Sequence, residues 1–152
     1  MNSSQSVKLF TIGYEGRPIE EFIELLSSRG ITAIIDVREN PYSRNRQYSR
    51  RSLEAALAEA GIEYIHLKSL GSPKYLRDRL KQDHDYESFN QAYNDYLNTQ
   101  IDTLSELYNL LTVNTICLIC LEHNPAHCHR HLIAERLRQR FFDKSHLEII
   151  NL

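Results

Sequence analysis

Short apolar runs that alternate with helical patterns constrain this chain more than any other feature. The run at 31–37 is almost continuously apolar and β-branched, which is typical of a parallel strand buried on both faces. Similar short runs cover 8–13, 62–67, 115–121 and 147–150, and helical spacing fills the intervals between them. Strands and helices that alternate at this spacing are typical of parallel strands joined by right-handed crossover helices. We therefore expect an α/β fold, a three-layer sandwich with a mostly parallel sheet of about five strands.

The helical patterns indicate where the sheet is covered. We expect helices after the first strand up to Gly30, from Ser49 or Ser52 to Ala60, and over 130–142. Two more helices are expected between 75 and 111, as an insert between the third and fourth strands. The insert could be ordinary covering helices, a cap or the surface of a homodimer. With 152 residues the chain suits one hydrophobic core, so 1–152 is expected to be a single domain.

Composition excludes several classes of protein. No apolar run approaches the roughly 20 residues that span a bilayer, and residues 1–6 lack the basic and apolar parts of a signal peptide. We expect a cytoplasmic protein without a membrane partner. Three cysteines are too few for a secreted disulfide framework, which favours reduced thiols. A formal charge of -2 gives no general attraction to nucleic acid, although the segment 38–51 is rich in arginine.

Reactive residue types follow the expected strands, where open parallel sheets bind their ligands. These residues are Tyr14, Glu15, Arg38, His66, Glu122, Cys128, His129 and Arg130. Because the carboxyl ends of parallel strands share one edge of the sheet, we expect these side chains to face one crevice.

Four blocks in register make the chain resemble a known family. They are the segment 11–16 (TIGYEG), the segment 36–38 (DVR) with Pro41, the segment 64–67 (YIHL) with Leu70 and Gly71, and the segment 120–122 (CLE) with 128–130 (CHR). In these blocks the chain is similar to the Domain of Unknown Function 488 family. The resemblance implies an α/β fold and assigns no reaction, so function has to be argued from the residues.

The cysteine region allows three interpretations. Asn124 and Pro125 are typical of a helix start, which would place Cys128 near the first turn, where Arg130 favours a nucleophilic thiolate. Cysteines also often serve as buried apolar fillers. A metal held by Cys120, Cys128 and one histidine stays open as the third interpretation. Cys117 and Cys120 should point to opposite faces of a strand, which argues against a structural zinc pair, and we assign no metal or other cofactor.

Glu122 and Glu15 are the candidate general acid and base, with His66 and Tyr14 nearby. Strand alternation places Glu122 on the same face as Cys120. The structural alternative pairs Glu122 with Arg130 or Arg38. Asp36, inside an apolar strand, should be an anchor for loop amides or for Arg38, because a buried charge is costly without a partner.

The basic loop supplies candidate ligands for phosphate. Arg38, Arg44 and Arg46 lie near Tyr42 and Tyr48, and arginine forks match phosphate oxygens while tyrosines stack on bases. A solvated charged loop is the alternative.

Together the residues favour a small enzyme, a hydrolase or group transferase, that acts on a phosphate-bearing, nucleotide-like or nucleic-acid substrate. The expected catalytic residues are Glu122, Cys128, His66, Tyr14 and Glu15. The expected substrate-binding residues are Arg38, Arg130, Arg44, Arg46, Cys120 and His129. The alternative function is a non-catalytic nucleic-acid-binding or ligand-sensing module whose cysteine-histidine loop is structural or binds metal.

Overall fold

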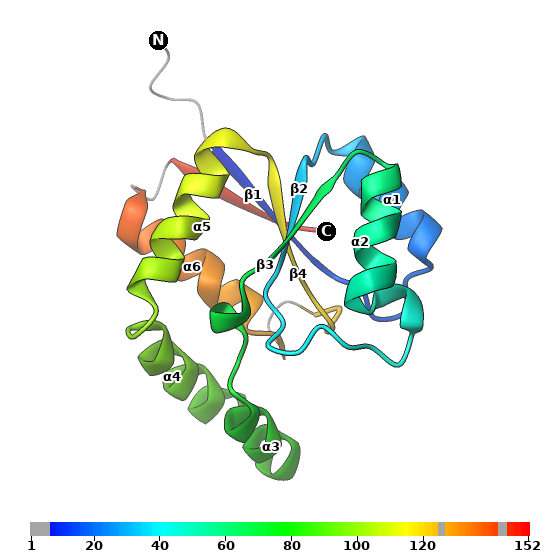
Figure 1. Cartoon of the computed structure of the whole chain (residues 1–152). Coiled ribbons are helices and arrows are strands. Elements are labelled where there is room, and N and C mark those ends of the chain that lie inside the picture. Colours follow the sequence, from blue (N-terminus) through cyan, green and yellow to red (C-terminus); the bar gives the residue numbers. More distant parts are fainter. Residues whose placement is uncertain (1–6, 125–126, 143–145) are drawn as a thin grey trace.

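The computed structural model describes residues 7–124, 127–142 and 146–152. Its five strands pair in parallel throughout, in the order β3-β2-β4-β1-β5 (Figure 1). They are β1 (Val7–Gly13), β2 (Ala33–Asp36), β3 (Glu63–His66), β4 (Ile116–Cys120) and β5 (Leu147–Asn151). The predicted α/β fold is confirmed, including the number of strands and the helical insert between the third and fourth strands.

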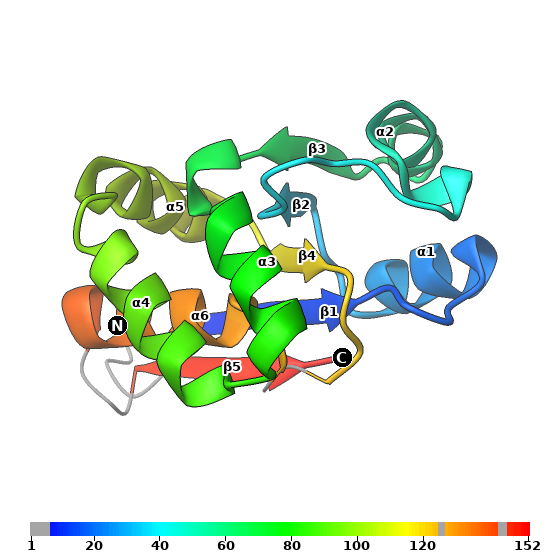
Figure 2. The same ribbon diagram turned by 90° about the horizontal axis from the view of Figure 1, so that it is seen from below.

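Six helices accompany the sheet in the described part of the chain. They are α1 (Ile19–Ser28), α2 (Arg50–Glu59), α3 (Lys74–Asp83), α4 (Tyr86–Leu97), α5 (Ile101–Val113) and α6 (Arg130–Phe141). Figure 2 shows α1 and α2 on one face of the sheet and α5 and α6 on the other. None of the described helices is both long and apolar enough to cross a membrane.

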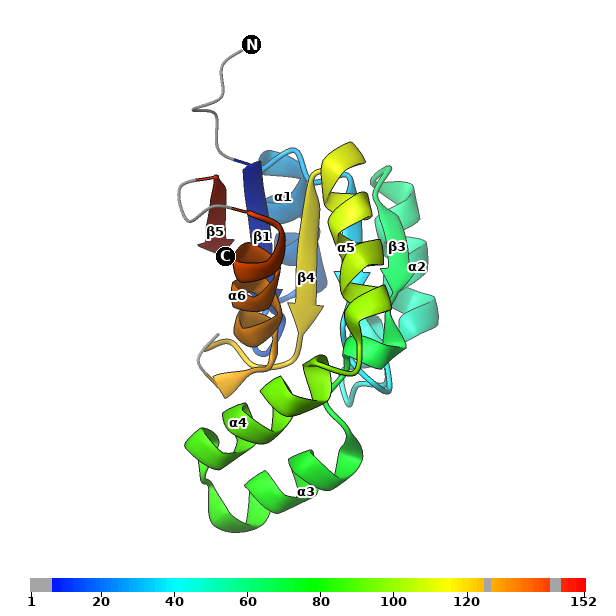
Figure 3. The ribbon, with the colours of Figure 1, turned by 90° about the vertical axis from the view of Figure 1, so that its left-hand side faces the viewer.

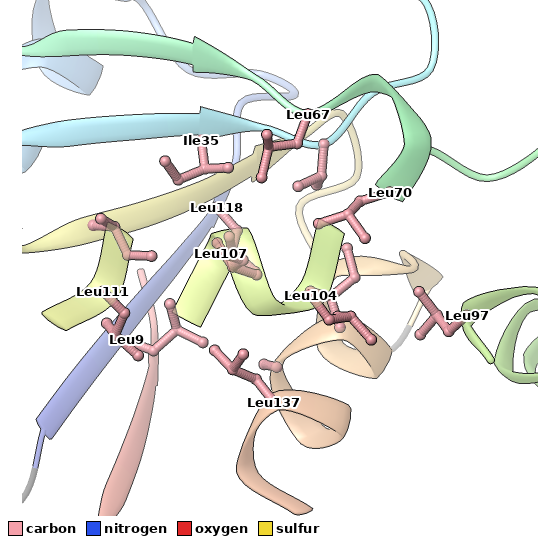
Figure 4. Close-up of a cluster of buried hydrophobic side chains, with 14 of the residues drawn as sticks. Leu9, Ile35, Leu67, Leu70, Leu97, Leu104, Leu107, Leu111, Leu118 and Leu137 are labelled. Atoms are coloured by element: carbon pink, nitrogen blue, oxygen red, sulfur yellow. The ribbon is translucent and has the colours of Figure 1, made fainter. Parts of the chain in front are cut away.

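Alternation along the buried strands divides the apolar side chains between two faces. Ile34 of β2 packs with Phe22 of α1 and Leu57 of α2. Its neighbour Ile35 points the other way and packs with Leu107 and other leucines of α5 and α6, as Figure 4 shows. The sheet is therefore covered on both faces, as the almost continuous apolar pattern of this strand predicts.

The insert holds three helices, so the prediction of two between 75 and 111 is wrong. His84 adopts a left-handed conformation (φ 52°) that ends α3, and the Asp85 side chain accepts a hydrogen bond from the Ser88 amide at the start of α4. With the second break, between α4 and α5, these local turn signals divide the stretch into three helices where two were expected. In Figure 3, α3 and α4 lie beyond the arrowheads of the strands, whereas α5 returns along the sheet.

The connections that leave the neighbouring strands β1 and β4 run in opposite directions across the sheet, so these two strands form its topological switch point. After β1 the chain runs into α1 on one face, and after β4 it runs toward α6 on the other. Pairing continues past both strands, because the Tyr14 amide donates to the Cys120 carbonyl at 3.1 Å and the Glu15 amide to the Leu121 carbonyl at 2.9 Å. A crevice at such a switch point is the usual ligand site of an open α/β sheet.

Candidate functional site

A pocket of about 510 Å³ lies at the carboxyl ends of the strands, under the cap formed by α3 and α4. Its floor includes Tyr14, Arg38, Cys120, Glu122, Cys128 and His129. Its cap side includes Arg77, Leu80, Lys81, Tyr86 and Phe89. The structure thus brings together residues from three of the sequence blocks and adds a cap that those blocks do not contain.

The other predicted site residues lie around this pocket. Glu15 and Arg44 border a neighbouring pocket of about 530 Å³, which shares Tyr14 with the first. His66 borders a third pocket of about 480 Å³, which shares Glu39 with the first. Arg46 is exposed. The single crevice expected from the sequence is therefore divided, and His66 is separated from Glu122.

Glu122 lies two residues past β4, and its Oε2 atom is 3.7 Å from Cys120 Sγ. Burial raises the pKa of the Glu122 carboxyl, against the opposing effects of a backbone hydrogen bond and the charge of Arg130. Within the described residues no lysine, arginine or histidine nitrogen lies within 4.0 Å of this carboxylate. Glu122 is thus a half-buried carboxyl that borders the pocket and forms no ion pair with the described residues.

Gly13 lets the loop that carries Glu122 approach β1. A Cβ atom at position 13 would overlap the Glu122 carbonyl oxygen and the backbone beside it. The glycine at the end of β1 therefore has a steric purpose, because only a residue without Cβ leaves room for this loop.

Arg38 is buried and largely committed to Asp36. Its Nε and Nη2 atoms donate to the two carboxylate oxygens at 2.8 and 2.7 Å, and Nη1 donates to the Tyr48 carbonyl at 2.8 Å. Burial alone lowers the pKa of Arg38, but hydrogen bonding and the charge of Asp36 more than offset it and raise the pKa. Tyr64 also donates to Asp36, at 2.5 Å. The predicted anchoring role of Asp36 is confirmed, and most Arg38 donors are occupied by the protein.

Arg130 is fully buried beneath the loop that follows β4. Its guanidinium donates to Thr11 Oγ1, to Cys120 Sγ at 3.1 Å, and to the carbonyls of Glu122 and His123. Burial lowers the pKa of Arg130. No carboxylate oxygen of a described residue lies within 4.0 Å of it. Arg130 thus connects β1, β4 and the loop from beneath the floor.

Cys120 and Cys128 form a disulfide, which corrects the expectation of reduced thiols for this pair. Cys117 is free and buried on the other face, and burial raises the pKa of its thiol. The helix α6 begins at Arg130, so Cys128 precedes its first turn, and Pro125 of the expected helix start lies outside the described residues.

Three donor atoms could hold a metal ion if the disulfide were open. Ligand atoms of Cys120, Glu122 and Cys128 lie within 4.8 Å of one another. Thiolate and carboxylate ligands suit zinc, and three protein ligands beside a pocket resemble an open catalytic site more than a closed structural one. The joined sulfurs do not offer this ligand set in the present state.

Aromatic and imidazole rings pack in and beneath the floor of the pocket. Burial lowers the pKa of His129 to about 4, so the ring is neutral near pH 7, and its Nε2 atom donates to the Val37 carbonyl at 2.6 Å. Tyr48 stacks on Tyr14 with 4.4 Å between ring centroids and is fully buried. Tyr48 is therefore a core residue, and Tyr42 is the exposed tyrosine of the basic loop.

The cap residues were missed by the sequence analysis. Arg77 donates to Glu39 Oε1 at 3.0 Å and to the Ser72 carbonyl, while Tyr86 stacks on His127 with 4.6 Å between centroids. Lys81 is exposed at the rim. Helical spacing could place these residues on helices, but it does not say that those helices lie over the carboxyl ends of the strands.

Comparison with known proteins adds one match. The family described as "Domain of unknown function DUF488" matches residues 18–137, most of the chain. No curated protein and no solved structure matches the chain. The segment 11–16 with Gly13 and Tyr14 precedes the matched range, while the floor residues after β2 and β4 lie within it. The chain belongs to DUF488, a family defined by its sequence and not by a known activity.

Proposed function

We propose that this protein is a small hydrolase or group transferase that binds a phosphate-bearing, nucleotide-like ligand under the α3–α4 cap. The observation that carries the proposal is Glu122, a half-buried carboxyl with a raised pKa that lacks an ion pair among the described residues and borders a pocket of about 510 Å³. A pocket of this volume suits a small molecule. Carboxyls with raised pKa values in pockets are typical general acids and bases.

The cap supplies charge for a phosphate group. Arg38 and Arg130 are occupied by protein acceptors, so the cations most open to a ligand are Lys81 at the rim and Arg77 beside it. Arg77 shares its guanidinium with Glu39, whereas Lys81 is exposed. Arg38 would then act chiefly by holding Tyr14, whose hydroxyl accepts from Nη1 at 3.3 Å.

Aromatic side chains at the same pocket suit a base or another flat ring. Tyr42 is 69% exposed and lines both the main pocket and its neighbour, and Tyr86 stands on the cap side. Stacking of a base on an aromatic ring contributes about 1–3 kcal/mol, independent of base identity. A nucleotide would thus place its ring near the tyrosines and its phosphates near Lys81.

Binding of adenosine triphosphate and inorganic phosphate, measured by calorimetry, tests the ligand class. Lys81→Ala should weaken nucleotide binding about tenfold or more, since a hydrogen bond to a charged group is worth roughly 1.5–3 kcal/mol. Lys74→Ala is the matched control, because Lys74 is exposed on the same helix, pairs with Asp78 and does not line the pocket. Equal affinities for the parent and both variants would refute this ligand site.

A second candidate, a non-catalytic nucleic-acid-binding module, is favoured by the exposed loop. Arg44 and Arg46 are exposed beside Tyr42, a combination that fits a single-stranded backbone and a stacked base. Under this function Arg46→Ala should weaken binding of a single-stranded oligonucleotide and reduce its salt dependence. Lys81→Ala should then have a smaller effect than Arg46→Ala, which is the reverse of the order expected for the pocket ligand.

A further inference from the structure

Arg130 carries a buried charge that the described ion pairs do not neutralise. The side chain is fully buried, and a buried cation is costly unless it is paired and hydrogen bonded. Three of its four acceptors are neutral oxygens, on Thr11, Glu122 and His123. The fourth is Cys120 Sγ, which lies 3.1 Å from Nη1. Of these four acceptors, the sulfur alone can become an anion under mild conditions, when its bond to Cys128 opens.

The two cysteines have different surroundings. Cys120 Sγ accepts from the guanidinium of Arg130, whereas Cys128 Sγ lies 3.7 Å from Nδ1 of His129, a ring that burial keeps neutral near pH 7. A neighbouring cation stabilises a thiolate and makes it a better leaving group. The electron pair released when the disulfide opens is therefore better placed on Cys120 than on Cys128.

We propose that Cys120 and Cys128 form a redox-active dithiol–disulfide site, which exchanges with low-molecular-weight thiols through the pocket and keeps its thiolate on Cys120 beside Arg130. Both cysteines border the pocket and are almost fully buried, so access is restricted to small reactants that enter under the cap. This activity is independent of the proposed phosphate ligand, because it requires only the sulfur pair and the guanidinium.

The exchange balances in two steps. A thiolate RS⁻ attacks Cys128 Sγ, a new S–S bond forms, the Cys120–Cys128 bond breaks, and its electron pair goes to Cys120 Sγ. A second RS⁻ attacks the sulfur of R in this mixed disulfide, which releases RSSR and leaves Cys128 as a thiolate that takes a proton from water. Two small thiols are thereby oxidised to one disulfide while the protein disulfide is reduced. Oxidised glutathione drives the same steps in reverse.

Ultraviolet absorbance of the thiolate, titrated against pH in the reduced protein, tests the position of the charge without requiring access by a reagent. In a Cys117→Ala background, reduced protein should hold one thiolate per chain at neutral pH. Adding Cys128→Ser should keep a thiolate that titrates ~1 pH unit or more below the roughly 8.5 of free cysteine, and adding Cys120→Ser should remove it. Cys117 lies on the opposite face of β4, so its removal leaves the pair in place. A low-titrating thiolate on Cys128, or none at neutral pH, would overturn the proposal.

Exchange itself is measured by equilibrating the full chain with mixtures of reduced and oxidised glutathione, without any phosphate-bearing ligand, followed by alkylation and peptide mass mapping. The Cys120–Cys128 bond should open and close as the mixture is varied, and Cys120→Ser should trap glutathione on Cys128. A pair that stays reduced or stays oxidised in every mixture contradicts the proposal. So does one zinc ion per chain that is retained by the dithiol, which would make these sulfurs metal ligands. Failure of the nucleotide-binding test leaves these outcomes unchanged.

Discussion

Replacing Glu122 with glutamine distinguishes an acid–base residue from a structural one before any substrate is known. Glutamine keeps the shape and most hydrogen bonds of the side chain but does not titrate. Breaking a buried ion pair would cost about 3–5 kcal/mol. In the described structure no cation nitrogen lies within 4.0 Å of the Glu122 carboxylate, so Glu122→Gln leaves no such partner stranded. We expect a change in unfolding free energy below about 1 kcal/mol near pH 4, which corresponds to roughly 2–4 °C in melting temperature.

The difference between parent and Glu122→Gln should depend on pH in a defined direction. Burial raises the pKa of Glu122, so the folded state holds this proton more tightly than the unfolded state does. The parent keeps the full contribution below the unfolded pKa of about 4.3 and loses it as pH rises through the higher folded pKa. The glutamine variant has no such loss. Its stability relative to the parent should therefore rise from about pH 4 to about pH 7.

Thermal melts and urea unfolding of the two proteins at several pH values in this range measure both effects. Glu54→Gln is the matched control, because Glu54 is exposed on α2 and does not line the pocket. A fall of about 6–20 °C for Glu122→Gln at neutral pH would show that the carboxylate neutralises a buried cation, and would refute the catalytic assignment. With a stable variant and a substrate in hand, turnover should fall by roughly 100-fold.

Three further predictions follow from buried groups. Gly13→Ala should destabilise the fold by about 1–3 kcal/mol in urea unfolding, because the new methyl group overlaps the Glu122 carbonyl; an unchanged free energy would mean that the loop moves aside freely. Asp36→Asn should cost about 3–5 kcal/mol by leaving buried Arg38 without its anion, and a loss below about 1 kcal/mol would contradict that pairing. Cys117 should resist alkylation in the native protein and react only after unfolding, because burial shields the thiol from the reagent and raises its pKa. Peptide mapping of alkylated native and unfolded samples checks this, and ready labelling of Cys117 in the native sample would contradict it.

The fold was predictable because the spacing of apolar residues along the sequence follows which positions are buried. A strand covered on both faces has to be apolar along its length, and Ile34 and Ile35 of β2 pack into opposite clusters as this requires. The number of helices in the insert was not predictable from periodicity, which led to two helices where the structure has three. The left-handed backbone of His84 and the cap hydrogen bond of Asp85 end α3 and begin α4, and helical spacing does not report such local turn geometry.

For the candidate site, the sequence predicted which residues lie at the strand ends better than it predicted their contacts. Strand ends located Tyr14, Arg38 and Glu122, because parallel strands bring their carboxyl ends to one edge. The sequence predicted Asp36 as an anchor for loop amides or for Arg38, but it could not say that protein acceptors would occupy most of the Arg38 donors, since that depends on the depth at which both side chains are buried. It also could not place Lys81, because the packing of α3 over the strand ends depends on contacts between distant parts of the chain.

Arg130 contributes both to the stability of the loop after β4 and to the proposed reactivity of Cys120 Sγ. The same guanidinium bonds the Glu122 and His123 carbonyls of the loop and donates to Cys120 Sγ. Arg130→Lys would keep the charge, but a single ammonium cannot reproduce donors spread over a planar fork, so both loop geometry and thiolate stability would change together. A loss of thiol exchange in that variant could therefore come from either cause. Cysteine variants separate them, because they alter the sulfur and leave the guanidinium with its three oxygen acceptors.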